Sequence, residues 1–297
     1  MSDSTRTTHV YGSYTQDELN AQYDTAKQVA GGDVAPYFAR MERESASARE
    51  ALTLDANRRY GAHERATIDF FPAPREGAPL LVWVHGGYWR RLSKDATSFV
   101  APPVVAAGGA VAVVNYPLAP EAKLEQIVDA VRSAYAYAVE HAYALNADAA
   151  NVYVGGHSVG AQLAGMVAAT FEVRGLLALS GLYDLEPIRL SHVNEWIAMD
   201  AATARENSPL FAPPRAAAPL LIATGEREQP EFHRQQRAYA EAWRGWGGEV
   251  REPGGAGLDH FSIVLELANA DSTISRALRE LMHGSGAPPR AQGEAGR

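Results

Sequence analysis

A serine between glycines is the residue of this sequence whose type and spacing point most directly to chemistry. Ser158 lies in Gly-His-Ser-Val-Gly (156–160), between an apolar run at 151–155 and an Ala-rich stretch at 161–170. This order predicts a strand, a tight turn and a helix, and glycines permit the sharp bend that exposes the hydroxyl beside the positive end of the helix. A hydroxyl placed in this way can attack a carbonyl carbon, so we interpret Ser158 as a candidate nucleophile.

A nucleophilic serine needs a base, and His260 is the expected one. In hydrolases with this turn, the partners follow the serine in the order acid, then histidine. His260 follows a Gly-rich loop and a predicted last strand at 249–252. Ligand sites in open parallel sheets form beyond the carboxyl ends of the strands, which is where this loop would lie.

The carboxylate that would orient the base is not decided by these residues alone. Glu228 and Glu226 lie in the loop after one predicted strand, and Asp184 lies in the loop after the preceding one. Asp259 is a poor candidate because the side chains of neighbouring residues diverge. Glu228, Glu226 and Asp184 therefore stay open at this point.

Donors for a developing oxyanion have a clear source. The motif His-Gly-Gly-Tyr-Trp (85–89) directly follows an apolar run. Glycines after a strand leave backbone N–H groups free to approach a ligand, and the second donor in such hydrolases is the N–H that follows the nucleophile. We therefore expect Gly86, Gly87 and Val159 to form the oxyanion hole.

The substrate pocket is less clear in the sequence. The aromatic residues that we interpret as its candidate lining are Tyr88, Trp89, Tyr183 and Trp196, although each of them would equally suit the core. An amino-acid substrate would also need a charge partner, for which Arg90, Arg91 and Arg189 are available.

Alternating apolar and amphipathic segments indicate the fold that must position these residues. Short, almost fully apolar runs predict buried parallel strands at 80–84, 110–114, 152–155, 176–179 and 220–223, and 67–71 alternates as an outer strand would. Helical spacing at 124–139 and 232–246 completes an α/β pattern with helices on both faces of a mostly parallel, doubly wound sheet.

We expect a single domain over residues 1–283. Its helical N-terminal segment, about 14–50, would pack on the outside or cap a pocket. The tail 284–297 is rich in Gly, Pro and Ala and is expected to be disordered.

Composition narrows the function classes. The formal net charge is −8, which argues against a basic nucleic-acid interface, and there are no cysteines, which excludes disulfides and thiolate chemistry. No apolar run approaches the roughly 20 residues that span a bilayer. We expect a cytoplasmic protein that acts on a small molecule, with no membrane or nucleic-acid partner and no metal, and with a homodimer left open.

Several motifs together resemble one known family. The motif at 85–89 is joined, in order, by 116–120 (Tyr-Pro-Leu-Ala-Pro), 180–185 (Ser-Gly-Leu-Tyr-Asp-Leu), 207–210 (Asn-Ser-Pro-Leu) and 259–261 (Asp-His-Phe). From about Tyr14 to Leu281 the chain resembles the arylformamidases, or kynurenine formamidases, of the α/β-hydrolase fold.

That resemblance implies a set of roles. Ser158 matches the nucleophile and His260 the base, and Glu228 stands where the family has an aspartate acid. The implied reaction is hydrolysis of N-formylkynurenine or a similar N-formyl aryl amine through a formyl-serine, without a cofactor. The alternatives are a carboxylesterase for small esters and a non-catalytic ligand-binding protein with a hydrolase fold.

Overall fold

The centre of the molecule is an eight-stranded sheet with the strand order β1-β2-β4-β3-β5-β6-β7-β8. It is seen in a computed structural model that describes residues 8–284. The strands are β1 Asp55–Arg59, β2 Thr67–Phe71, β3 Ala78–Val84, β4 Ala110–Val114, β5 Ala147–His157, β6 Leu176–Leu179, β7 Leu220–Ala223 and β8 Val250–Arg251. β2 pairs antiparallel with β1 and β4, and all other neighbours are parallel.

The apolar runs of the sequence form the inner strands. Every residue of β3, β4, β6 and β7 is buried, because helices cover both faces of the sheet. The expectation that 67–71 is the outer strand is wrong, because β1 pairs with it and occupies the edge. β1 reads Asp-Ala-Asn-Arg-Arg and is exposed at every position, so it has no apolar pattern that would reveal it.

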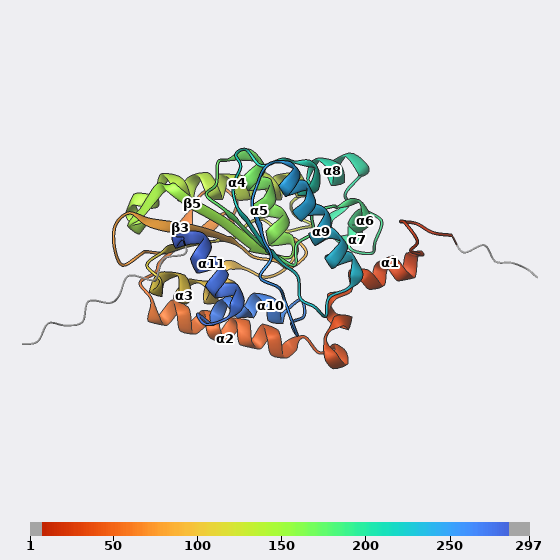
Figure 1. Ribbon diagram of the computed structural model, residues 1–297, viewed down its shortest axis with the longest axis horizontal. Helices are drawn as coiled ribbons and strands as arrows, with labels where there is room; N and C mark the ends of the chain where they lie inside the picture. The colour runs from red at the N-terminus through yellow and green to blue at the C-terminus, as the bar shows by residue number, and fades with distance from the viewer. Residues whose placement is uncertain (1–7, 285–297) are drawn as a thin grey trace, which may run out of the picture.

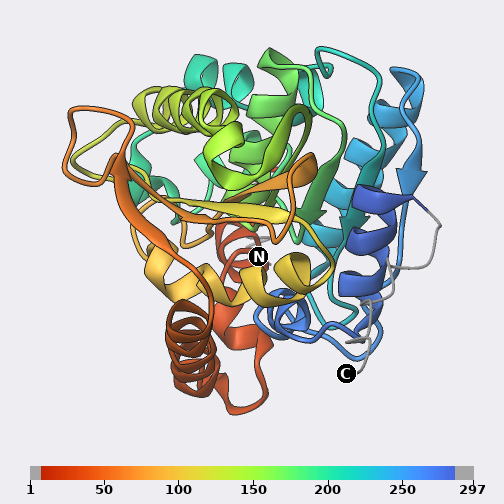
Figure 2. The ribbon, with the colours of Figure 1, turned by 90° about the vertical axis from the view of Figure 1, so that its left-hand side faces the viewer.

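Helices cover the sheet on both faces (Figures 1 and 2). They are α1 Gln16–Gln22, α2 Ala35–Ala51, α3 Ala101–Ala106, α4 Leu124–Glu140, α5 Val159–Thr170, α6 Glu186–Arg189, α7 Asn194–Ile197, α8 Ala201–Glu206, α9 Pro230–Gly245, α10 Ser262–Leu265 and α11 Thr273–His283. Side chains of α4, α5 and α9 belong to the hydrophobic core on one face, and those of α2, α3 and α11 belong to the core on the other.

The N-terminal segment takes both of the positions that its sequence allowed. α2 lies along the outside of the molecule in Figure 1 and buries Met41 against the second core. α1 and the 3₁₀ turn Thr25–Gln28 lie instead near the carboxyl ends of the strands, with Leu19 and Tyr23 fully buried in the first core. The expected disorder of the tail falls on residues 285–297, which lie outside the described part of the chain.

A buried ion cluster fastens α2 to the sheet. Asp69 on β2 is fully buried and accepts from Lys94 Nζ at 3.0 Å and from the guanidinium of Arg49 on α2. The backbone N–H of Asn57 also donates to Asp69, at 2.7 Å. Because a buried carboxylate is stable only when it is paired, this cluster fixes where α2 crosses the sheet.

Candidate active site

Ser158 lies at a strained turn between β5 and α5. Its backbone has φ 57° and ψ −125°, an unfavourable region for a residue with a side chain. Glycines make the turn fit, since a Cβ on Gly160 would lie 2.2 Å from the carbonyl oxygen of Val84, and one on Gly156 would lie 2.2 Å from that of Gly160. The Ser158 N–H donates to the carbonyl of Leu179 on β6 at 2.8 Å, which fastens the turn to the sheet.

A continuous chain of hydrogen bonds runs from Ser158 to a carboxylate. Ser158 Oγ lies 3.2 Å from His260 Nε2, and His260 Nδ1 lies 2.6 Å from Glu228 Oε2. All three residues are at least 95% buried. With Nδ1–H donating a hydrogen bond to Glu228, the lone pair of Nε2 faces the serine hydroxyl, as a general base requires.

Both oxygens of Glu228 are engaged. Oε1 accepts from Ser180 Oγ at 2.5 Å and from the N–H of Gly225 at 2.7 Å, while Oε2 accepts from His260. Ser180 directly follows β6 and has φ 47°. Its contact with Glu228 was not anticipated from the sequence, and its only signal there is its position at the carboxyl end of a buried strand.

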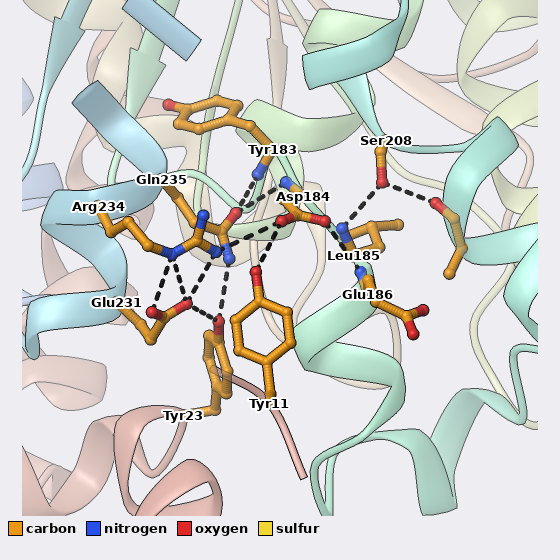
Figure 3. A network of polar contacts seen from close by, with 11 residues as sticks. Tyr11, Tyr23, Tyr183, Asp184, Leu185, Glu186, Ser208, Glu231, Arg234 and Gln235 are labelled. Atoms are coloured by element: carbon orange, nitrogen blue, oxygen red, sulfur yellow. Dashed lines mark hydrogen bonds and ion pairs between the residues drawn. The ribbon is translucent and has the colours of Figure 1, made fainter. Parts of the chain in front are cut away.

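The rival carboxylates point elsewhere. Asp184 accepts from Tyr11 Oη at 3.1 Å and from Arg234 at 3.4 Å, within a polar network outside the triad (Figure 3). Glu226 accepts from the N–H of Gly257 at 2.7 Å. Neither of them bonds to His260, so the geometry favours Glu228 as the orienting carboxylate.

A second histidine supports the base. His157 Nε2 donates to the carbonyl oxygen of His260 at 2.7 Å, and the two rings lie 4.7 Å apart. Burial holds the pKa of His157 well below its usual value, and the neighbouring His260 lowers it further. His157 is therefore a neutral donor that fixes the backbone of the base, a role that the sequence did not reveal.

The glycine loop after β3 approaches the nucleophile closely. A Cβ on Gly86 would lie 3.2 Å from that of Ser158, and one on Gly87, where φ is 107°, would lie 2.2 Å from the carbonyl oxygen of Arg91. Within residues 8–284, the N–H groups of Gly87 and Val159 donate to no protein acceptor. Gly87 lines the same cavity as Ser158, and Val159 is the first residue of α5, so both groups remain available to an oxyanion.

His85 holds that loop from behind. Its ring stacks on Tyr116 with centroids 4.2 Å apart, and its Nδ1 donates to the carbonyl of Gly86 at 2.8 Å. Burial lowers the pKa of His85 to about 4. The ring is therefore neutral near pH 7, and it adds no charge beside the oxyanion loop.

Two of the four predicted pocket aromatics line the cavity, and two do not. Tyr88 and Trp196 line it and contact each other edge-to-face at 5.7 Å. Trp89 is fully buried and donates from Nε1 to Gln162 at 3.0 Å, and Tyr183 stacks on Tyr239 at 4.3 Å. The prediction that Trp89 and Tyr183 line the pocket is wrong, because both rings pack in the core.

The cavity above Ser158 has a volume of about 130 Å³, which favours a compact substrate. One wall comes from the N-terminal segment, through residues that include Tyr23, Asp24 and Phe38. The segment thus caps the pocket. In the part of the chain that the structure describes, no cluster of three or more metal-ligating side chains occurs, and no helix is long and apolar enough to cross a membrane.

Comparisons with known proteins identify chains that are similar to this one. A family model described as alpha/beta hydrolase fold matches residues 81–262. The kynurenine formamidase of Danio rerio is 28% identical over 289 residues, which cover 91% of this chain and 97% of the relative. That of Drosophila melanogaster is 28% identical over 252 residues, covering 78% and 83%. The resemblance expected from the motifs is confirmed.

Solved structures extend the likeness. The structure of a candidate thioesterase from Silicibacter sp. tm1040 has a TM-score of 0.78 and 27% identity, and the match covers 89% of this chain and 98% of that one. An esterase from Pyrobaculum calidifontis has a TM-score of 0.70 at 18% identity, covering 83% and 90%. The second match indicates the shared fold alone.

Proposed function

The chain belongs to the alpha/beta hydrolase fold family and is a hydrolase, and we propose that it removes the formyl group from N-formyl aryl amines such as N-formylkynurenine. The observation that carries the proposal is the continuous hydrogen-bond chain Ser158–His260–Glu228. Its support is the similarity to kynurenine formamidases over 91% of the chain.

In the first half of the proposed reaction, Ser158 Oγ attacks the formyl carbon while His260 Nε2 takes the hydroxyl proton. Glu228 stabilises the imidazolium that forms, because its Oε2 accepts a hydrogen bond from Nδ1–H, with the two atoms 2.6 Å apart. The negative charge on the formyl oxygen is received by the N–H groups of Gly87 and Val159, and loss of one such donor typically raises the barrier by about 3 kcal/mol.

The second half releases the products. His260 donates its proton to the nitrogen of the departing aryl amine as the C–N bond breaks, which leaves a formyl ester on Ser158. Water then gives a proton to His260 and its oxygen attacks the ester, so formate leaves and the serine regains its hydrogen. Every proton moves through His260, and no cofactor takes part in this scheme.

Cleavage of a small ester or thioester is the second candidate. The observation that favours it is the similarity to the candidate thioesterase from Silicibacter sp. tm1040, at 27% identity and a TM-score of 0.78. The same triad and oxyanion donors serve both acyl classes, so a comparison of substrates must decide between them.

We also propose a cytoplasmic location, with which the cysteine-free sequence is compatible.

A substrate comparison tests the proposal. We expect kcat/KM for N-formylkynurenine to exceed that for phenyl acetate and for an acetyl thioester. Ser158→Ala should lower kcat by at least about 10⁴-fold, whereas Ser133→Ala, on the exposed face of α4, should not change it. Turnover of esters without any turnover of the formamide would refute the formamidase reading.

A phosphonate probe directed at activated serines separates catalysis from simple ligand binding. We expect covalent labelling at Ser158 and none in Ser158→Ala. Absence of labelling in the unmodified protein would favour a non-catalytic binding protein with this fold.

A further inference from the structure

Two opposite charges line the active-site cavity without pairing with each other. Asp24 belongs to the N-terminal segment and Arg91 to the loop after β3, and both line the cavity that contains Ser158. No ion pair joins them within 4 Å. A cavity with separated charges of both signs is suited to a ligand that itself carries both signs.

Arg91 is the arginine with a free head group at this site. The guanidinium of Arg90 lies 4.2 Å over the Trp196 ring, and Arg189 donates to both oxygens of Glu186 at 2.7 and 2.8 Å. Within residues 8–284, the Arg91 side chain makes no ion pair and no hydrogen bond to a protein group. It is therefore available to an anionic group of a ligand.

The backbone of Arg91 is fixed relative to the oxyanion loop. Its N–H and that of Arg90 both donate to the carbonyl oxygen of Gly87 at 3.1 Å. Because Gly87 is the proposed oxyanion donor, this turn sets how far the guanidinium can lie from the scissile bond. The long side chain then adapts to the rest of the ligand.

Asp24 is held by its neighbour Tyr23. The Tyr23 carbonyl accepts from Tyr88 Oη at 2.7 Å, and Tyr23 Oη donates to Glu231 at 2.9 Å. The ion pair of Asp24 is with Lys27, whose side chain is 75% exposed. Because the lysine is so exposed, this pair contributes little, and Asp24 can exchange Lys27 for a ligand ammonium.

The hydroxyl of Tyr88 responds to both charges. Burial raises its pKa, the carboxylates of Glu228 and Asp24 raise it further, and Arg91 opposes them. Asp24, Arg91 and the triad carboxylate therefore act on one point of the cavity wall, which is consistent with a ligand that reaches from Ser158 to both charges.

We propose that Arg91 and Asp24 select substrates that carry an α-amino-acid group, with Arg91 binding the carboxylate and Asp24 the ammonium. This inference rests on the proposed function in that the amino-acid group is attached to the N-formyl aryl amine that Ser158 attacks. Arg91 is suited to the carboxylate because a guanidinium binds it through two parallel N–H donors.

Direct binding to Ser158→Ala tests the proposal without turnover. Calorimetry would compare kynurenine with two relatives that each lack one charge: the amine without the carboxylate, and the keto acid without the ammonium. We expect kynurenine to bind most tightly. Adding Arg91→Ala should weaken the two carboxylate-bearing ligands at least about 10-fold relative to the amine.

Asp24→Asn should give the reverse pattern, weakening kynurenine and the amine relative to the keto acid. Arg40→Ala on α2 and Asp129→Asn on α4 remove exposed charges outside the cavity and are the matched controls. Equal affinities for all three ligands, or losses in Arg91→Ala that do not depend on the carboxylate, would overturn the proposal.

Turnover separates this inference from the proposed function. In the unmodified enzyme, we expect kcat/KM for N-formylkynurenine to exceed that for a neutral N-formyl aryl amine, and Arg91→Ala should bring this ratio toward one. Equal turnover of the two substrates would refute the charge selection alone. No turnover of either formamide would refute the proposed function, while the binding result would still stand.

Discussion

Glu228 stands where the resemblance described above implies an aspartate, and both of its carboxylate oxygens are engaged. Glutamate is one methylene longer than aspartate. The extra length is absorbed because Oε1 is held by Ser180 and the N–H of Gly225, so that Oε2 still meets His260 at 2.6 Å. The contacts of Oε1 thus position Glu228 as much as the contact of Oε2 with His260 does.

We predict that Glu228→Gln lowers kcat by about 10³- to 10⁴-fold, because the amide neither fixes the tautomer of His260 nor stabilises its imidazolium. Glu228→Asp should lose less activity. Adding Ser180→Ala to Glu228→Asp should lower the remaining kcat further. The measurement is kcat on the preferred substrate, with Asp184→Asn as the comparison. A greater loss in Asp184→Asn than in Glu228→Gln would contradict our choice of acid.

The sequence could predict Ser158 and His260, because each belongs to a local motif that a turn or a loop defines. It could not choose the acid from residue types alone, since that choice depends on which loop reaches His260 across the sheet. His157 and Ser180 escaped prediction for the same reason. Their partners lie 103 and 48 residues away.

The N-terminal segment is an element that joins two loops of the site. The Tyr23 hydroxyl donates to Glu231 on α9 and accepts from Gln235 at 3.0 Å (Figure 3). The Tyr23 backbone carbonyl accepts a hydrogen bond from the hydroxyl of Tyr88. Glu231 is 2% exposed and also binds Arg234. The cap is therefore joined to the start of α9 and to the oxyanion loop through one residue.

We predict that Tyr23→Phe lowers the free energy of unfolding by about 1–3 kcal/mol, because Glu231 and Gln235 lose a partner while they remain buried. Chemical denaturation at pH 7 measures this change. Tyr143→Phe removes a hydroxyl from a side chain that is 85% exposed and should change stability by less than about 0.5 kcal/mol. Equal stability of the two variants would show that the Tyr23 contacts contribute nothing net.

Elements with a strong pattern were predictable and weakly patterned ones were not. The runs at 110–114, 176–179 and 220–223 form β4, β6 and β7 with those bounds, because strands buried on both faces must be apolar throughout. β1 is held to the sheet by backbone pairing with β2, so its side chains carry no requirement that a pattern search could detect.

Across the whole molecule, buried neutral histidines make stability depend on pH. Burial lowers the pKa of His85 to about 4, whereas an unfolded chain binds that proton near pH 6.5. Between these values the unfolded state holds more protons, so the free energy of unfolding falls as the pH falls. His157, whose pKa also lies well below its usual value, acts in the same direction.

We therefore predict a loss of about 2 kcal/mol through His85 alone between pH 7 and pH 5. Urea denaturation at the two pH values measures it. His85→Asn, which removes the titrating ring, should show a smaller difference between pH 7 and pH 5, whereas His233→Asn on α9 should keep the difference of the unmodified protein. An unchanged difference in His85→Asn would contradict the assignment.

The N-terminal segment that caps the pocket is separate in the chain from the catalytic residues. The residues that the proposed reaction uses follow β3, β5, β7 and β8, whereas part of the wall that meets the substrate precedes β1 in the chain. Mutations before Leu52 can therefore change which molecules enter while Ser158 stays in place. Chimaeras with related chains that exchange this stretch, and keep Leu19 and Tyr23 as anchors, offer a route to new selectivity on an unaltered catalytic base.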